Sequence, residues 1–321
     1  MPEDQPSPPA GTIDPQIREF ARLLNEAYAT HGDARDVAHR RQIAERVRET
    51  WRSGGPVMAE TRDMIVDGLR LRLHRPTSRS DGPVMLYVHG GGWVLFSIDS
   101  HDRLMREYAS RADIAVIGID YSLAPEAKFP VAIDEVCAVL AWIEAQGRSL
   151  GIDPERIFVG GDSAGANLSV AACLKRREAG RAPLAGMVLN YGAFDPAPTA
   201  SYDLYGGPDH ILNGAEMDAF WEAYTHHPEQ RLDPLVAPLK ADLHDLPPAF
   251  VAVAECDILA DSNHAFAAKL REAGVPVEEV TYAGATHSFL EAVSIAPLAS
   301  RALDDQARWI RARSDAQEQA D

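Results

Sequence analysis

Cysteine is scarce in this chain of 321 residues, which contains only three, Cys137, Cys173 and Cys256. The three form neither a CxxC pair nor an even framework of spacings. A fold held together by disulfides normally has several paired cysteines, so this pattern argues against one. It favours a protein of a reducing compartment.

Long apolar runs and basic charge are also lacking. No stretch approaches the run of about 20 apolar residues that a membrane span needs. The formal charge of −17 opposes binding to nucleic acid, whose phosphates are held mainly by Lys and Arg, and to anionic lipid. Residues 1–11 are rich in proline and acidic residues and lack the basic and apolar segments of a signal peptide. We therefore expect a disordered leader, a cytoplasmic protein, no nucleic-acid or membrane partner, and a small neutral substrate.

The composition that remains is that of one globular unit. Apolar residues make up 46% of the chain and charged residues 25%, which is ordinary for a protein with a packed interior. The length suits one large domain with an accessory element.

Two helices and a hairpin are predicted before residue 75. Asp14 followed by Pro15 is a good helix start, and apolar residues recur at helical spacing through two stretches that stop at Gly54 and Gly55. We expect residues 12–55 to form helices that cover another part of the protein. A hairpin turn at Asp67 and Gly68 joins two alternating stretches that begin the sheet.

From residue 83 the pattern changes to short apolar runs separated by helical stretches. The runs cover residues 84–88, 114–119, 157–159, 187–189, 250–253 and 277–282. Strands buried on both faces have this pattern, and their alternation with helices predicts an α/β fold with a mostly parallel, doubly wound central sheet. The connection after residue 192 is too long for an ordinary link. We assign 193–240 to a cap insertion, and 56–192 with 241–321 to the catalytic domain.

Residues 161–165, GDSAG, fit the G-x-S-x-G nucleophile elbow. In this turn a serine, here Ser163, is held between a strand and a helix with its hydroxyl above the sheet edge. The pattern alone is weak, but an apolar strand runs into it and a helical stretch runs out of it. That context is what the elbow requires.

A second glycine-rich loop, HGGGW at residues 89–93, follows another predicted strand. Its three glycines let successive backbone amides point at one developing negative charge, as in the oxyanion loops of lipases and esterases. Neither loop completes a dinucleotide-binding motif, and no Walker lysine follows. We expect His89 to hold the loop in shape rather than to transfer a proton.

The remaining catalytic groups should follow the serine in the order acid, then base. His287 follows the last apolar strand through a loop at the sheet edge, whereas His264 sits within a helical stretch. We therefore predict His287 as the general base. Asp257 ends the preceding strand and is the predicted acid, while Asp261 more naturally begins the next helix.

Together these segments resemble the hormone-sensitive lipase family of α/β-hydrolase carboxylesterases. The resemblance extends over most of the chain from about residue 60 to 313 and includes DYSLAPE at residues 120–126. It implies a helical cap built from the first helices and the insertion after Tyr191. It also implies oxyanion donors at the amides of Gly91, Gly92 and Ala164.

Four aromatic residues have two interpretations that the sequence does not separate. They either line the acyl or alcohol pocket or pack within the cap: Trp93, Phe194, Trp221 and Tyr224. His226 and His227 lack a companion at metal-ligand spacing. We expect no metal and no cofactor.

The function expected from this pattern is hydrolysis of short- to medium-chain acyl esters through a Ser-His-Asp triad and an acyl-enzyme. An amidase or peptidase could use the same residues. A ligand-binding receptor is another alternative, because one plant hormone receptor branch of the family has lost its catalytic histidine, but retention of His287 argues against it. The sequence leaves the oligomeric state open, and a homodimer is compatible with it.

Overall fold

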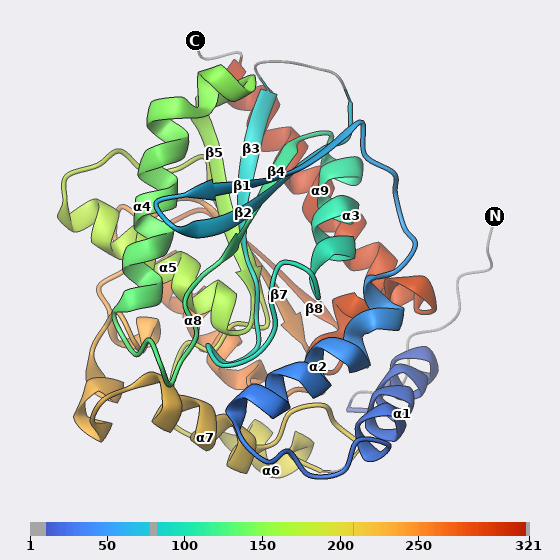
Figure 1. Ribbon diagram of the computed structural model, residues 1–321. Helices are drawn as coiled ribbons and strands as arrows, with labels where there is room; N and C mark the ends of the chain where they lie inside the picture. The colour runs from blue at the N-terminus through green and yellow to red at the C-terminus, as the bar shows by residue number, and fades with distance from the viewer. Residues whose placement is uncertain (1–10, 78–81, 208, 319–321) are drawn as a thin grey trace.

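A single eight-stranded sheet organises the protein in the computed structural model, which describes residues 11–77, 82–207 and 209–318 (Figure 1). Its strand order is β1-β2-β4-β3-β5-β6-β7-β8. Pairing is antiparallel from β1 to β2 and from β2 to β4, and parallel elsewhere. The strands are β1 (Glu60–Val66), β2 (Leu69–Arg75), β3 (Gly82–Val88), β4 (Ala115–Asp120), β5 (Ile152–Asp162), β6 (Gly186–Asn190), β7 (Ala249–Ala254) and β8 (Val277–Tyr282).

The sheet confirms the predicted α/β-hydrolase architecture. Asp67 and Gly68 both have positive φ, which is the backbone of a tight hairpin turn, and every residue of β7 is buried. Side chains alternate between two hydrophobic clusters along β3: Leu86 and Val88 face one, and Met85 and Tyr87 face the other.

Helices cover both faces of the sheet. One cluster is completed by α4 (Val131–Gln146), α5 (Ala164–Glu178) and α8 (Ala260–Glu272). The other is completed by α3 (Asp102–Ala112) and α9 (Pro297–Glu318). Short 3₁₀ turns lie between the larger elements: η1 (Gly147–Leu150), η2 (Pro228–Leu232), η3 (Pro238–Lys240) and η4 (Phe289–Ser294).

Four further helices gather at one end of the sheet, at the lower edge of Figure 1. They are α1 (Pro15–Ala29), α2 (Val37–Arg52), α6 (Ala200–Tyr205) and α7 (Gly214–Tyr224), and they fall within residues 12–55 and 193–240. The Asp14 carboxylate accepts hydrogen bonds from the amides of Gln16 and Ile17 at 2.9 and 3.1 Å, so it caps α1. Because the Asp14 amide donates to the Gly284 carbonyl at 3.0 Å, α1 is tied to the loop that leads to His287.

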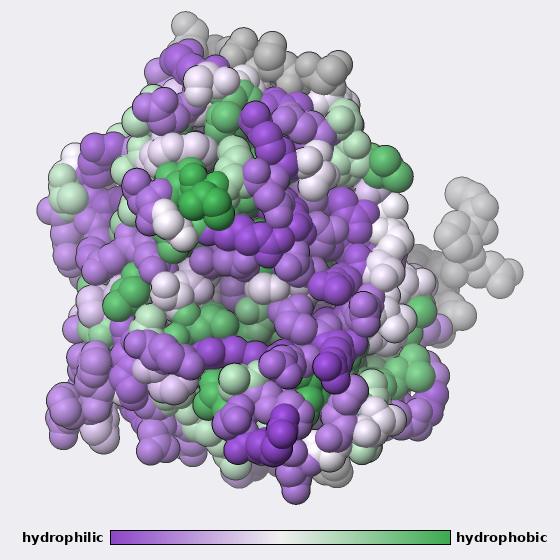
Figure 2. Space-filling view, in the orientation of Figure 1, coloured by the Kyte–Doolittle hydropathy of each residue, from purple (hydrophilic) through white to green (hydrophobic). Residues whose placement is uncertain are grey.

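The predicted leader lies almost wholly outside the described residues. Among the residues that are described, no helix combines the length and the hydrophobicity needed to cross a membrane. The face in Figure 2 is mostly hydrophilic, with apolar residues in small separate patches.

Candidate active site

Ser163 occupies a strained turn between β5 and α5. Its backbone angles are φ 52° and ψ −116°, a conformation that L-residues rarely adopt. The turn requires glycine on both sides, because a Cβ at Gly161 or Gly165 would lie only 1.8 or 1.9 Å from the Val88 carbonyl oxygen. Local sequence thus brings the serine hydroxyl to the sheet edge.

The structure brings Ser163 together with the two groups predicted to activate it. His287 Nε2 lies 3.0 Å from Ser163 Oγ, and His287 Nδ1 lies 2.7 Å from Asp257 Oδ2. The three residues are 2 to 7% exposed. The other Asp257 oxygen accepts a hydrogen bond from the Leu259 amide at 3.1 Å, which fixes the carboxylate. Asp257 follows β7 and His287 follows β8, so neighbouring parallel strands deliver both groups to one edge.

The environment of His287 favours its charged form. Burial disfavours the imidazolium, but the adjacent Asp257 carboxylate outweighs that cost through its charge and its hydrogen bond. The pKa of His287 is therefore raised above its ordinary value. A base of raised pKa holds a proton taken from serine more firmly.

The glycine-rich loop has a backbone that only glycine accommodates. Gly91 and Gly92 have φ values of 104° and 61°. A Cβ at Gly92 would lie 2.3 Å from the Phe220 ring, and one at Gly91 would lie 2.3 Å from the Leu95 carbonyl oxygen. Of the hydrogen bonds found in the described part of the chain, none is donated by the Gly91 or Gly92 amides.

The third predicted oxyanion donor is the amide of Ala164. Ala164 is the first residue of α5, where backbone amides have no acceptor within the helix. The positive end of the helix dipole also lies there. The Ala164 amide thus joins the Gly91 and Gly92 amides as a candidate oxyanion donor next to Ser163.

The alternative acid and bases lie away from the serine. Asp261 accepts a hydrogen bond from the Ser201 amide at 3.0 Å, which joins α8 to the cap insertion. His264 is exposed and pairs with Glu279. His89 Nδ1 lies 2.8 Å from the Gly90 carbonyl oxygen, and its ring stacks on Tyr121 at 4.4 Å. His89 therefore shapes the loop, as its position in the sequence suggested.

A cavity of about 1020 Å³ opens over Ser163 and His287. Ligand pockets of enzymes typically hold about 300–1,000 Å³, so this one has room for more than a small acyl group. The cap supplies most of the wall, through α1, α2, residues 206, 207 and 210–213, and α7. Apolar wall residues include Leu24, Ile43, Leu95, Phe96, Met217 and Phe220, and charged ones include Asp33, Arg40, Arg48 and Glu216.

Of the two interpretations left open for Trp93, Phe194, Trp221 and Tyr224, the structure corrects that of pocket lining and supports that of packing. None of these four lines the cavity among the described wall residues. The Trp93 ring lies parallel to Tyr224 at 4.4 Å and tilted against Trp221 at 4.5 Å. Phe194 stacks on Phe266 at 4.1 Å. They pack inside the protein because large rings contribute most when wholly removed from water.

Phe220 is the wall residue that the sequence did not distinguish. It immediately precedes Trp221 on α7, and both lie among the apolar residues of one helix face. Periodicity marks that face as buried, but it does not say which side chains border a cavity. The Phe220 ring borders the Gly92 backbone, whereas Trp221 packs behind it.

A protein metal site usually combines several His, Cys, Asp or Glu side chains. Within residues 11–77, 82–207 and 209–318, no group of three or more is placed to hold an ion. His226 and His227 are exposed just before η2.

Known proteins share this architecture and much of the sequence. A family model described as alpha/beta hydrolase fold matches residues 85–291. An esterase from Pyrobaculum calidifontis is 32% identical, with a TM-score of 0.86 over 94% of this chain and 98% of that one. EstE1, a thermophilic carboxylesterase cloned from a metagenomic library, is 35% identical, with a TM-score of 0.84 over 87% of this chain and 98% of that one. One of two fungal esterases from Rhizomucor miehei is 29% identical, with a TM-score of 0.88 over 98% of this chain and its full length.

These matches confirm the predicted family. The chain therefore belongs to the alpha/beta hydrolase fold family, in its hormone-sensitive-lipase-like branch of serine carboxylesterases.

Proposed function

We propose that the protein hydrolyses carboxylic esters of short to medium acyl chain length, with Ser163, His287 and Asp257 as its triad. The observation that carries this proposal is the continuous contact from Asp257 Oδ2 to His287 at 2.7 Å and from His287 to Ser163 Oγ at 3.0 Å. A serine hydroxyl becomes a competent nucleophile only when a base removes its proton.

The reaction has two halves. Ser163 Oγ attacks the ester carbonyl carbon while His287 Nε2 takes the hydroxyl proton. The carbonyl oxygen becomes an oxyanion within reach of the Gly91, Gly92 and Ala164 amides. When the intermediate collapses, the bond to the alcohol oxygen breaks and His287 returns the proton to that oxygen. Water then attacks the acyl-enzyme by the same steps and releases the acid.

The cavity supports a neutral ester with a limited acyl chain. A buried methylene contributes about 0.8 kcal/mol, roughly fourfold in kcat/KM, until the wall is reached. Met217 and Phe220 belong to the apolar wall, and the Phe220 ring borders the Gly92 backbone. The hydrophilic face in Figure 2 carries no broad apolar area of the kind that binds lipid surfaces.

The test is kcat/KM for p-nitrophenyl esters from acetate to palmitate, each below its solubility limit, with Ser163→Ala as the inactive reference. We expect the maximum at about eight carbons or fewer, with about fourfold gain per methylene up to it. A maximum at long chains would instead indicate a lipase. Faster cleavage of matched anilides than of esters would indicate an amidase.

Two phenylalanines provide a matched pair for the same assay. Phe220→Ala enlarges the cavity and should move the optimum to longer or bulkier acyl groups. Phe194→Ala removes a ring that contacts Phe266 and not the cavity. It should lower stability by about 3–5 kcal/mol without moving the optimum. If the optimal acyl-chain length were unchanged in Phe220→Ala, the acyl chain would not contact Phe220.

A further inference from the structure

A buried carboxylate lies directly beside the nucleophile. Asp162 precedes Ser163 and is only 3% exposed. Its Oδ1 accepts hydrogen bonds from the Tyr87 hydroxyl at 2.7 Å and from the Gly90 amide at 3.1 Å. Gly90 is the first glycine of the oxyanion loop, so one oxygen joins this loop to the nucleophile elbow. A carboxylate buried this deeply needs a compensating charge.

The compensating group is His101, whose Nε2 lies 3.4 Å from the same oxygen of Asp162. His101 is 2% exposed and precedes the first residue of α3. Its other ring nitrogen, Nδ1, lies 3.3 Å from the Ser97 carbonyl oxygen and 3.1 Å from Ser100 Oγ. The Ser100 hydroxyl lies 2.8 Å from the Ser97 carbonyl and can donate its proton there, and in that orientation it accepts from His101.

Both ring nitrogens of His101 therefore face acceptors. A carbonyl oxygen and a carboxylate oxygen cannot donate, so in either neutral form of the ring one nitrogen lone pair would face an oxygen, which is unfavourable. A histidine with a proton on both nitrogens is an imidazolium cation. The buried 3.4 Å contact of Nε2 with the Asp162 carboxylate, together with the Nδ1 contact with the Ser97 carbonyl, thus favours a positive charge on His101.

The charges around His101 agree with that assignment. Burial opposes the imidazolium, but the Asp162 charge and hydrogen bond outweigh it and raise the pKa of His101, with smaller support from Glu291 and Glu45. Burial likewise opposes the Asp162 carboxylate, and His101 outweighs it, so the pKa of Asp162 is lowered.

The neighbouring histidine, His89, differs from His101 in its charge. The His89 ring lies 5.5 Å from His101, and its Nε2 has no hydrogen-bond partner among the described residues. Burial, with the nearby His101 charge, lowers the pKa of His89 to about 3. His89 is therefore neutral, and the pair contains one cation.

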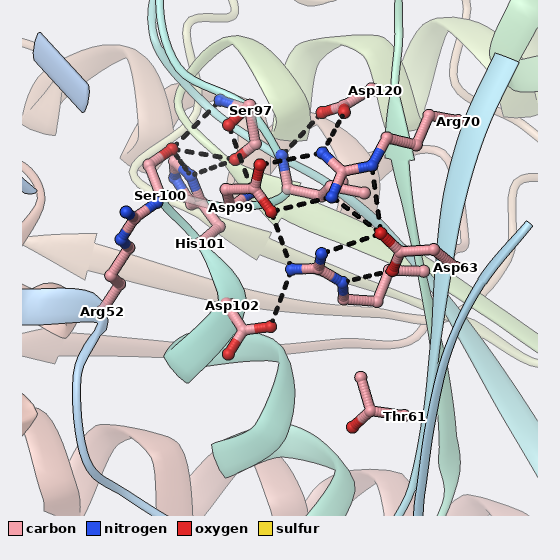
Figure 3. A network of polar contacts seen from close by, with 12 residues as sticks. Arg52, Thr61, Asp63, Arg70, Ser97, Asp99, Ser100, His101, Asp102 and Asp120 are labelled. Atoms are coloured by element: carbon pink, nitrogen blue, oxygen red, sulfur yellow. Dashed lines mark hydrogen bonds and ion pairs between the residues drawn. The ribbon is translucent and has the colours of Figure 1, made fainter. Parts of the chain in front are cut away.

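The segment that carries His101 is clamped to the first hairpin (Figure 3). Arg70 on β2 holds both oxygens of Asp99, at 2.8 and 3.0 Å, and also contacts Asp63 and Asp120. Arg72 donates to Asp102, the first residue of α3, at 3.0 Å. Because the two arginines bind Asp99 and Asp102, which lie on either side of His101, the backbone that carries the His101 ring is held in place beside Asp162.

We propose that His101 is a positioning residue that acts as a buried cation, holding Asp162 and through it the Gly90 end of the oxyanion loop beside Ser163. Its role in turnover rests on the proposed ester hydrolysis, whereas its charge does not. Loss of the cation would leave Asp162 buried without compensation. The Gly90 amide and the donors that follow it would then lose their fixed distance from the serine.

The charge is tested on the folded wild-type protein by NMR of histidine labelled with nitrogen-15. At neutral pH, His101 should have protons on both ring nitrogens and His89 on one. Asp162→Asn should return His101 to a single proton. A neutral His101 ring in the wild type would overturn the proposal, whether or not any variant folds.

The positioning role is tested by His101→Gln, with His264→Gln as the matched control, since His264 is an exposed histidine that also pairs with a carboxylate. We expect kcat for an activated ester to fall about 10- to 100-fold in His101→Gln, with KM within about threefold, because the donors are misplaced rather than removed. His264→Gln should match the wild type. A folded His101→Gln variant with wild-type kcat would refute positioning. If the wild type itself hydrolyses no ester, the proposed function is wrong. The NMR measurement of ring protonation then tests by itself whether His101 and Asp162 form an ion pair.

Discussion

Arg48 Nε donates to Glu291 Oε2 at 2.7 Å, and the two side chains are only 3 and 7% exposed. Arg48 lies on cap helix α2, and Glu291 lies on η4, four residues after His287. The guanidinium also stacks over the Phe96 ring at 4.7 Å. A buried ion pair thus joins the cap to the loop that carries the general base.

Removing one partner of that pair should be costly. Arg48→Met leaves the Glu291 carboxylate buried and unpaired, and we expect the free energy of unfolding to fall by about 3–5 kcal/mol. Urea denaturation measures it. The double variant Arg48→Met/Glu291→Leu removes both charges and should recover most of the loss. A single variant as stable as the wild type would mean that water reaches the pair.

The two aspartates after β7 should differ in their effect on turnover. Asp257→Asn is expected to lower kcat by about 10⁴, because the amide holds His287 in the wrong tautomer. Asp261→Asn should do much less, since its carboxylate contacts the Ser201 amide and not the histidine. Steady-state kinetics of both variants decides. Greater damage from Asp261→Asn in a folded protein would reverse the assignment.

The pH dependence of turnover follows from the raised pKa of His287. The base works only when neutral, so the rate should rise with pH. Because Asp257 stabilises the imidazolium, the midpoint should lie above 6.5, the ordinary value for histidine. Asp257→Asn removes that charge and should move the midpoint of the residual activity to lower pH. A wild-type midpoint at or below the ordinary value would show that burial outweighs the carboxylate.

The oxyanion loop predicts a specific glycine effect. In Gly92→Ala the new methyl would lie 2.3 Å from the Phe220 ring, so the loop must move, and loss of a donor costs about 10²- to 10³-fold in kcat. Gly68→Ala is the control. Gly68 also has positive φ, but no atom lies within 4 Å of its Cβ position. It should lose some stability and no activity. Equal kcat in both variants would argue that the Gly92 amide is not a donor.

Much of this site could be predicted from sequence because its signals are local. GDSAG and HGGGW encode backbone turns that require glycine at defined positions, and apolar runs mark the strands that end beside them. Asp257 could be preferred over Asp261 from its distance to the strand end. Such inferences need only neighbouring residues.

The cavity wall and the His101 pair could not be predicted in this way. Phe220 and Trp221 are adjacent on one helix, and only the packing of Trp93 against Trp221 separates a wall residue from a core residue. His101 and Asp162 are 61 positions apart, and neither segment signals the other. Contacts of that kind arise from tertiary packing and leave no periodic pattern in the chain.

Attack of Ser163 on the ester carbonyl can be tested with an alkylphosphonate p-nitrophenyl ester. The reagent transfers its phosphorus to an activated serine and releases one nitrophenol for each active site. Peptide mass spectrometry should place the adduct on Ser163, with activity lost in proportion to nitrophenol released and no adduct in Ser163→Ala. Full inactivation with the adduct on another residue would exclude Ser163 as the nucleophile. So would a protein that, after treatment with the reagent, carries no adduct and still hydrolyses esters.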